Sequence, residues 1–194
     1  DTGAMYRAAT WAAVDAGLPA EEGSAMTALL SGLELRFGDE GRLFVNGTDV
    51  TLAIRERSIS NQVSAYAALA SVRELMSRSQ REMGESGDLV CEGRDMGTFV
   101  FPDAKVRIYL DASPEVRAER RAKELRDKGE TVDFDGLLKE IKARDAADQS
   151  RAVAPLKRVP EQHYVDSSAM SRDEVISTLL TIARSGLGNA ANRS

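Results

Sequence analysis

The chain has 194 residues, of which 42% are hydrophobic and 29% charged, and this composition predicts a globular protein with one main core and a small appended unit. No apolar run approaches the roughly 18 residues of a membrane span, and the first residues do not resemble a signal peptide, so we expect a cytoplasmic protein that binds no membrane. A formal net charge of −5 argues against a broad nucleic-acid-binding surface.

The chain opens with a predicted helix. Residues 4–16 are good helix formers, Asp1 and Thr2 can cap the start, and Gly17 is a stop signal. A second short helix is expected over residues 20–30.

The apolar pattern then changes to short β-type runs, at residues 34–37, 42–45 and 48–52. Asn46 and Gly47 between the last two form a strong two-residue hairpin signal. The three runs predict a three-stranded antiparallel meander, which is too small to fold alone and is therefore expected to be an insertion on a larger body.

Residues 58–83 have helical composition, with a break expected near Ala70. The letters SVRE at residues 71–74 match a capping box, so a new helix is predicted to begin at Val72. Ser64 and Arg73 are nine residues apart and would point in opposite directions on one straight helix, so only a bent segment lets both contact one ligand.

Three further apolar runs, residues 89–91, 106–111 and 164–166, predict core strands. Cys91, the single cysteine, lies inside the first run and is expected to be a buried structural thiol. The letters GRDMGT at residues 93–98 follow, which places an Arg-Asp pair between glycines at the predicted end of a strand.

Helices are predicted between and after these strands. One runs from Pro114 to about Lys128 behind a Ser113 cap, and the next covers residues 134–150 behind Asp133. A capping box, SRDE at residues 171–174, precedes a final helix that is expected to end near Gly186, and residues 188–194 are expected to be disordered.

Strands that alternate with helices indicate an α/β fold with a parallel sheet flanked by helices, carrying the small three-stranded antiparallel insert. In open sheets of this type ligands bind beyond the carboxyl ends of the strands, where residues 92–98 are expected to lie. One histidine and one cysteine argue against a His-based metal cluster or a catalytic triad, so chemistry must come from charge placement.

Arginine outnumbers lysine by 20 to 6, and the planar guanidinium binds phosphate bidentately. For any single arginine, the arginine-rich composition that a GC-rich genome produces explains its presence as well as phosphate binding does. Arg144, Asp148 and Arg151 are spaced i, i+4 and i+7, so two guanidiniums flank one carboxylate on a helix stripe, an arrangement that suits a polyanionic ligand with hydroxyls. An ordinary ion pair on a solvated helix face is the alternative.

Three segments together closely resemble bacterial cytidylate kinase, a nucleoside monophosphate kinase of the P-loop class: DTGAMYR at residues 1–7, GRDMGT at 93–98 with FPDA at 101–104, and RD at 144–145 through RAVAPL at 151–156. The resemblance extends to about residue 183, and the meander resembles that family's insert. It implies a core with monophosphate-binding helices at residues 1–32 and 54–113, an insert at 33–53, a lid at 114–152, and the last core strand and helix at 153–194.

The resemblance implies transfer of the ATP γ-phosphoryl group, with Mg²⁺, to CMP or dCMP, and a monomer whose partners are small nucleotides. Arg7 and Arg94 would hold the acceptor phosphate. The residues implied to read cytosine are Ser64, Arg73, Asp95 and Arg151. Arg144 and Asp148 would grip the pentose, beside Tyr6, and Thr2 belongs to the same substrate-binding set.

Arg117, Arg120 and Arg121 resemble the mobile lid arginines that close over ATP and stabilise the transition state. They lie among Glu115, Glu119 and Glu124, so a salt-bridged surface helix is an equal alternative.

The chain departs from the family in one respect, because it contains no G-x-x-x-x-G-K-[ST] loop. We expect the natural protein to carry this loop, with the first strand, ahead of Asp1, and residues 1–194 alone to bind ATP poorly or not at all. The alternatives are a non-catalytic nucleotide-binding remnant, or a kinase for UMP or AMP, against which Asp95 and Ser64 argue.

Overall fold

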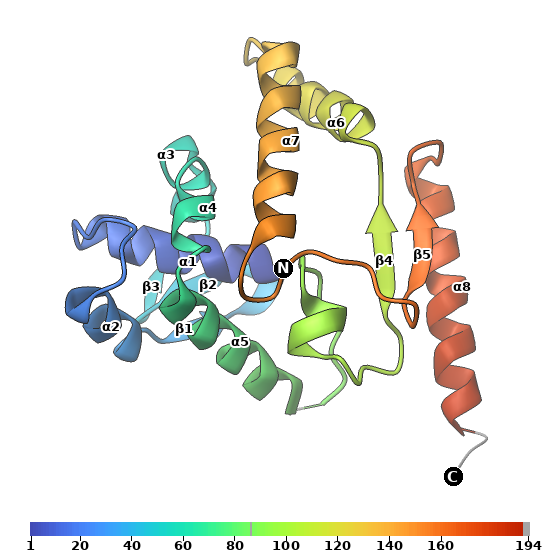
Figure 1. Ribbon diagram of the computed structural model, residues 1–194, viewed down its shortest axis with the longest axis horizontal. Helices are drawn as coiled ribbons and strands as arrows, with labels where there is room; N and C mark the ends of the chain where they lie inside the picture. The colour runs from blue at the N-terminus through green and yellow to red at the C-terminus, as the bar shows by residue number, and fades with distance from the viewer. Residues whose placement is uncertain (86, 192–194) are drawn as a thin grey trace. The chain divides into compact units, whose positions relative to one another are not determined.

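The computed structural model describes residues 1–85 and 87–191, and the chain divides into two compact units, Asp1–Arg94 and Asp95–Ser194 (Figure 1). None of the helices in the described part combines the length and apolarity needed to cross a membrane.

The first unit begins with helix α1 (Thr2–Asp15), as predicted. The Asp1 carboxylate caps it by accepting from the Ala4 N–H at 2.9 Å, and Gly17 follows the last turn with φ +66°. Helix α2 (Ser24–Ser31) starts four residues later than the predicted start at residue 20, because residues 19–22 form a turn in which the Glu21 N–H donates to the Pro19 carbonyl.

The predicted meander is confirmed as strands β1 (Leu35–Phe37), β2 (Leu43–Val45) and β3 (Thr48–Asp49), paired antiparallel in that order. Asn46 and Gly47 both have positive φ, the signature of a type I′ hairpin turn. The third strand is shorter than predicted, because after Asp49 the chain turns so that Val50 enters the core.

The 58–83 segment is broken, as predicted, but into more pieces. After the 3₁₀ turn η2 (Ala53–Arg55) come three helices, α3 (Arg57–Ser60), α4 (Val63–Tyr66) and α5 (Ala70–Glu85). The predicted capping box was wrong: α5 begins at Ala70, ahead of Ser71. The Ser71 N–H donates instead to the carboxylate of Glu22, 3.1 Å away, so a distant residue caps this helix.

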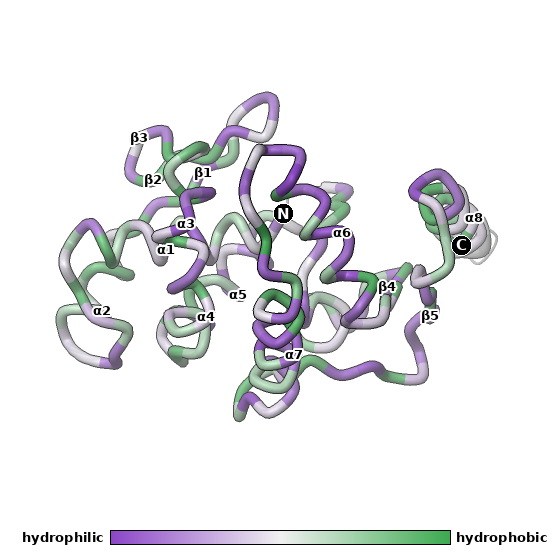
Figure 2. The backbone as a smooth tube through the Cα atoms, turned by 90° about the horizontal axis from the view of Figure 1, so that it is seen from above, coloured by the Kyte–Doolittle hydropathy of each residue, from purple (hydrophilic) through white to green (hydrophobic). Residues whose placement is uncertain are grey.

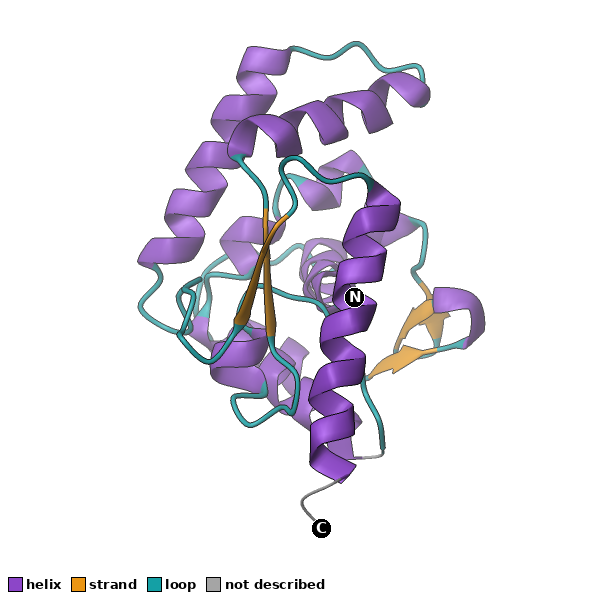
Figure 3. Cartoon of the chain, turned by 90° about the vertical axis from the view of Figure 1, so that its right-hand side faces the viewer, coloured by secondary structure: helices purple, strands orange, loops and turns teal. Residues whose placement is uncertain are grey.

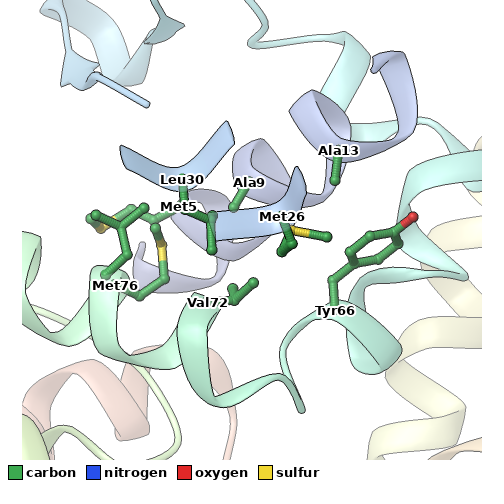
Figure 4. Packing of buried hydrophobic residues seen from close by; sticks show 9 residues of the cluster. Met5, Ala9, Ala13, Met26, Leu30, Tyr66, Val72 and Met76 are labelled. Atoms are coloured by element: carbon green, nitrogen blue, oxygen red, sulfur yellow. The ribbon is translucent and has the colours of Figure 1, made fainter. Parts of the chain in front are cut away.

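Helix α1 lies between two apolar clusters, one on each face. One face packs with residues of α2, α4 and α5, which Figure 4 shows converging on Met5 and Ala9; its buried members are Met5, Ala9, Ala13, Met26, Leu30, Tyr66, Val72, Leu75 and Met76. The other face packs against the meander and the turn η2, and its buried members are Ala4, Ala8, Ala12, Leu43, Val45, Val50 and Ile54.

The strand predicted at residues 89–91 is absent. The two sheets of the described residues contain no partner for this segment, and Val90 is 100% exposed and Leu89 45% exposed. Apolar residues become a strand only when a neighbouring backbone pairs with them, and here none does. Cys91 is consequently half-buried, not buried as expected, and residues 92–98 do not follow a strand end.

In the second unit, strand β4 (Ile108–Asp111) pairs in parallel with β5 (His163–Asp166), and the two lie side by side in Figure 3. The connection between them holds two helices packed on each other, α6 (Pro114–Asp127) and α7 (Phe134–Ser150). Both predicted caps are present, because Ser113 Oγ accepts from the Val116 N–H and Asp133 Oδ1 from the Gly136 N–H.

The last helix, α8 (Arg172–Ala191), has the predicted capping box, with the Ser171 N–H donating to Glu174 and the Glu174 N–H to Ser171 Oγ. It continues past Gly186, so the predicted end was wrong. A Cβ on Gly186 would lie 2.6 Å from Val106 Cγ2, which indicates that this glycine serves close packing. Residues 188–191, predicted as disordered, are helical, and residues 192–194 lie outside the described part.

The two units together form a helix-rich α/β structure with a two-stranded parallel sheet and a small antiparallel sheet, compatible with the predicted P-loop kinase-like class.

Met76→Ala should lower the free energy of unfolding by about 2–4 kcal/mol, because Met76 is fully buried beside α1 and its removal leaves a cavity. Urea denaturation followed by circular dichroism measures the change. Glu74→Ala, at an exposed position of the same helix, is the control and should change stability by less than about 0.5 kcal/mol. Equal effects of the two changes would contradict the packing described for α5.

Candidate functional site

Hydrogen bonds of Thr2 and Asp1 fix the start of α1. The Thr2 N–H and hydroxyl both donate to the Glu92 carbonyl, at 3.2 and 2.6 Å, which anchors the segment leading to Arg94 against the helix. Asp1 caps the helix with one carboxylate oxygen and pairs with Arg7 Nη2 through the other, at 2.9 Å.

Arg7 is a half-buried guanidinium with charged neighbours of both signs. Burial and the nearby charge of Arg55 lower the pKa of Arg7, and Glu92 acts in the opposite direction. A cation that is partly desolvated and close to a second cation gains strongly from an anionic ligand.

Arg73 and Tyr6, both predicted as ligand contacts, are brought together. Arg73 lies in the first turn of α5 and is only 3% exposed; its guanidinium carbon is 5.7 Å from the centre of the Tyr6 ring, and Nη1 donates to the Ala67 carbonyl at 3.3 Å. Ser64 is exposed on α4, whereas Arg73 lies on α5, so the bend predicted between the two residues is present.

Arg94 is exposed, and Asp95 is buried at the start of a short π-helical turn, Met96–Val100. The Asp95 carbonyl accepts from three successive N–H groups, those of Thr98, Phe99 and Val100. These three backbone hydrogen bonds fix the turn directly after the Arg-Asp pair.

Gly97, within the same motif, serves close packing. A Cβ there would lie 2.9 Å from Gln162 Nε2, and the Gly97 carbonyl accepts from Arg107 Nη1 at 3.3 Å. The motif is therefore fastened to the segments that precede β4 and β5.

Arg151 and Asp148 form an ion pair at the end of α7, and Asp148 is 2% exposed. Arg151 lies just past the helix, with an extended ψ of 140°, so its side chain returns to Asp148 from a bend and not along a helix stripe. The Asp148 carbonyl also accepts from the Leu156 N–H at 2.8 Å, which holds the RAVAPL loop against the helix. Arg144 is exposed on α7.

The three predicted lid arginines have different surroundings. Arg117 donates to both oxygens of Asp145 on α7, at 3.0 and 2.5 Å, and to the Ala112 carbonyl; the hydrogen bond that it donates to Asp145 raises the pKa of Arg117. Arg120 donates to the carbonyl and hydroxyl of Ser167, after β5. Arg121 forms an exposed pair with Glu124, which matches the surface-helix alternative for this residue.

The described residues contain no group of three or more His, Cys, Asp or Glu side chains that could hold a metal ion.

A family model described as cytidylate kinase matches residues 1–185. The chain belongs to this family. It is 43% identical to a cytidylate kinase of Aeromonas salmonicida, over 98% of this chain and 84% of that protein, and 44% identical to one of Shouchella clausii, over 95% and 83%. A bifunctional pantoate ligase/cytidylate kinase of Synechococcus is 45% identical over 95% of this chain and 37% of that protein. The resemblance inferred from the three motifs is thereby confirmed.

Arg55 and Glu22 were not predicted from the sequence. Arg55 is one of 20 arginines and belongs to no motif, and Glu22 lies in a turn. Both become noticeable only through partners 48 or 49 residues away, Arg7 and Ser71, so no local pattern could identify them.

Arg117 and Asp145 should couple strongly in a double-mutant cycle. With Arg117→Gln and Asp145→Asn, urea denaturation should give a coupling free energy of about 1–3 kcal/mol, because the paired groups are partly buried and bidentate. The matched control is Arg121 with Glu124 on the same helix, exposed and expected to couple by less than about 0.5 kcal/mol. Similar coupling in both cycles would show that the Arg117 pair does not join α6 to α7.

Glu22→Gln should weaken the cap of α5 and lower the free energy of unfolding by roughly 0.5–1 kcal/mol at pH 7. Hydrogen bonds from Ser71 lower the pKa of Glu22, so its stabilisation is complete above the ordinary glutamate pKa and is lost as the pH falls through the lower, folded-state pKa. Urea denaturation at pH 7 and at about pH 3 should therefore show the difference between wild type and variant shrinking in acid. Glu21→Gln, at the neighbouring exposed position, should show no such difference; a loss equal to that of Glu22→Gln would refute the cap.

Proposed function

We propose that this protein transfers the γ-phosphoryl group of ATP to CMP or dCMP, giving CDP or dCDP. The observation that carries the proposal is membership of the cytidylate kinase family across residues 1–185, with the three motifs intact. A cytoplasmic location, small-nucleotide partners and a monomeric state stay predictions.

Phosphoryl transfer requires a protein mainly to align two phosphates and to offset their negative charge. For the acceptor phosphate we propose Arg7 and Arg94. The half-buried Arg7 is held in place by Asp1, and Arg94 is exposed next to the short π-helical turn that follows Asp95. Arg94 would also offset charge on the migrating group, as the resemblance implies.

For cytosine recognition we propose Ser64, Arg73, Asp95 and Arg151, the residues that the family resemblance implies. A carboxylate or hydroxyl accepts from the exocyclic amine, and guanidiniums donate to the ring acceptors. Uracil carries a carbonyl in place of the amine, so Asp95 would face it acceptor to acceptor, a mismatch that a buried carboxylate makes costly.

For the pentose we propose Arg144 and Asp148, which lie one turn apart on α7. Tyr6 would pack beside the sugar, and Thr2, whose hydroxyl holds the Glu92 carbonyl, would support the same set from the start of α1.

For ATP we propose the helix pair α6 and α7 as the lid, with Arg117, Arg120 and Arg121 facing the phosphates. Arg117 and Arg120 would exchange their bonds to Asp145 and Ser167 for bonds to nucleotide oxygens as the lid closes. Mg²⁺ supplies further charge neutralisation when bound.

A coupled ADP-release assay with CMP, dCMP, UMP and AMP tests the proposal. CMP and dCMP should be phosphorylated, and UMP and AMP should react at least about 100-fold less efficiently in kcat/KM, because the buried acceptor is mispaired. Asp95→Ala should lower kcat/KM for CMP about 10- to 100-fold while changing that for UMP little.

Equal turnover of UMP and CMP by the wild type would remove the role of Asp95, and turnover of AMP alone would replace the proposed substrate.

A further inference from the structure

The 3₁₀ turn η2, which carries Arg55, is held firmly against α1. Ile54 is buried and packs with Ala4 and Ala8, the residues that bracket Arg7 on the helix. The backbone of the turn is fixed by hydrogen bonds from Ile54 to Val50 and from Arg55 to Leu52. Arg55 therefore reaches its position from a rigid support, not from a mobile loop.

Arg55 places a second positive charge near Arg7. The charge of Arg55 is close enough to lower the pKa of Arg7, and two nearby guanidiniums repel each other. Asp1 pairs with Arg7, but the part of the chain that the structure describes offers Arg55 no acidic partner, and Arg55 is exposed. Repulsion of this kind is relieved by an anion that accepts from both groups.

Arg7 also keeps donor capacity that the described residues do not use. Its Nη2 donates to Asp1, whereas its Nε is buried and has no hydrogen-bond partner among the described residues. A guanidinium offers five N–H donors in a fixed fork, a geometry that matches phosphate oxygens.

We propose that Arg55 binds the acceptor phosphate together with Arg7, so that the monophosphate subsite is formed partly by the turn that follows the insert. The ligand class is a phosphate monoester dianion, and the inference rests on the proposed function. Two guanidiniums would neutralise the charge that otherwise repels the incoming γ-phosphoryl group, and the pair would raise affinity for the nucleotide over the nucleoside.

The experiment compares Arg55→Gln, Arg55→Lys and the control Arg78→Gln, which removes an exposed arginine of α5 that pairs only with the neighbouring Glu82 among the described residues. Calorimetric titration with CMP and with cytidine separates phosphate recognition from base and sugar recognition. Arg55→Gln should weaken CMP binding roughly 10- to 100-fold, the loss expected for a charge-assisted hydrogen bond, and should leave cytidine binding unchanged. Arg55→Lys should recover part of the CMP affinity, and Arg78→Gln should match wild type.

Inorganic phosphate provides a probe that does not depend on the reaction. It should raise the Tm of the wild type and of Arg78→Gln, and raise that of Arg55→Gln much less. Unchanged phosphate and CMP binding in Arg55→Gln, or equal losses for CMP and cytidine, would overturn the inference while leaving the kinase proposal intact. If the wild type phosphorylates no nucleotide but shows the Arg55-dependent phosphate response, the proposed function fails and the anion subsite stands.

Discussion

The packing of α1 on two faces is the constraint on which the first unit depends. A helix that is covered on both sides needs small residues on at least one of them, and here Ala4, Ala8 and Ala12 allow the meander to approach its backbone closely. Met5 fills the opposite side against α5. Because both faces are occupied, the helix cannot rotate or shift, and Arg7 at the junction of the two faces acquires a fixed direction. A larger side chain on the alanine face would separate the insert from the helix.

The helix pair α6 and α7 is held by different forces. Hydrophilic residues dominate α6 in Figure 2, and its buried side chains are the small Ala118 and Ala122. Arg117 and Arg120 therefore carry much of its attachment, the first to α7 and the second to the end of β5. Polar contacts can be exchanged for contacts to a ligand at little cost in free energy, whereas a buried apolar interface cannot be exchanged in this way. The helix pair α6 and α7 is therefore suited to the movement that a lid requires.

Elements whose signals are local could be predicted from the sequence, and those that depend on distant partners could not. Asp1, Ser113, Asp133 and the Ser171 box cap their helices as expected, since each bond spans about three residues. At α5 the same rule failed, because a carboxylate 49 residues away satisfies the Ser71 N–H. The failures at residues 89–91 and at Gly186 also involve distant residues: a strand requires a pairing partner, and Gly186 lies inside a helix where its missing side chain lets Val106 pack closely.

The candidate site divides in the same way. The motifs predicted a nucleotide ligand and grouped Asp148 with Arg151, but not the bend past α7 from which Arg151 pairs with Asp148. Arg55 was missed because folding of the insert brings it to Arg7. Val45, Val50 and Ile54 all pack on the alanine face of α1, so the meander and the turn after it form one anchored unit. An insert too small to fold alone thus gains its stability from the helix that carries Arg7, and in return it fixes the position of a second guanidinium. The same burial that stabilises the insert makes it part of the proposed phosphate subsite.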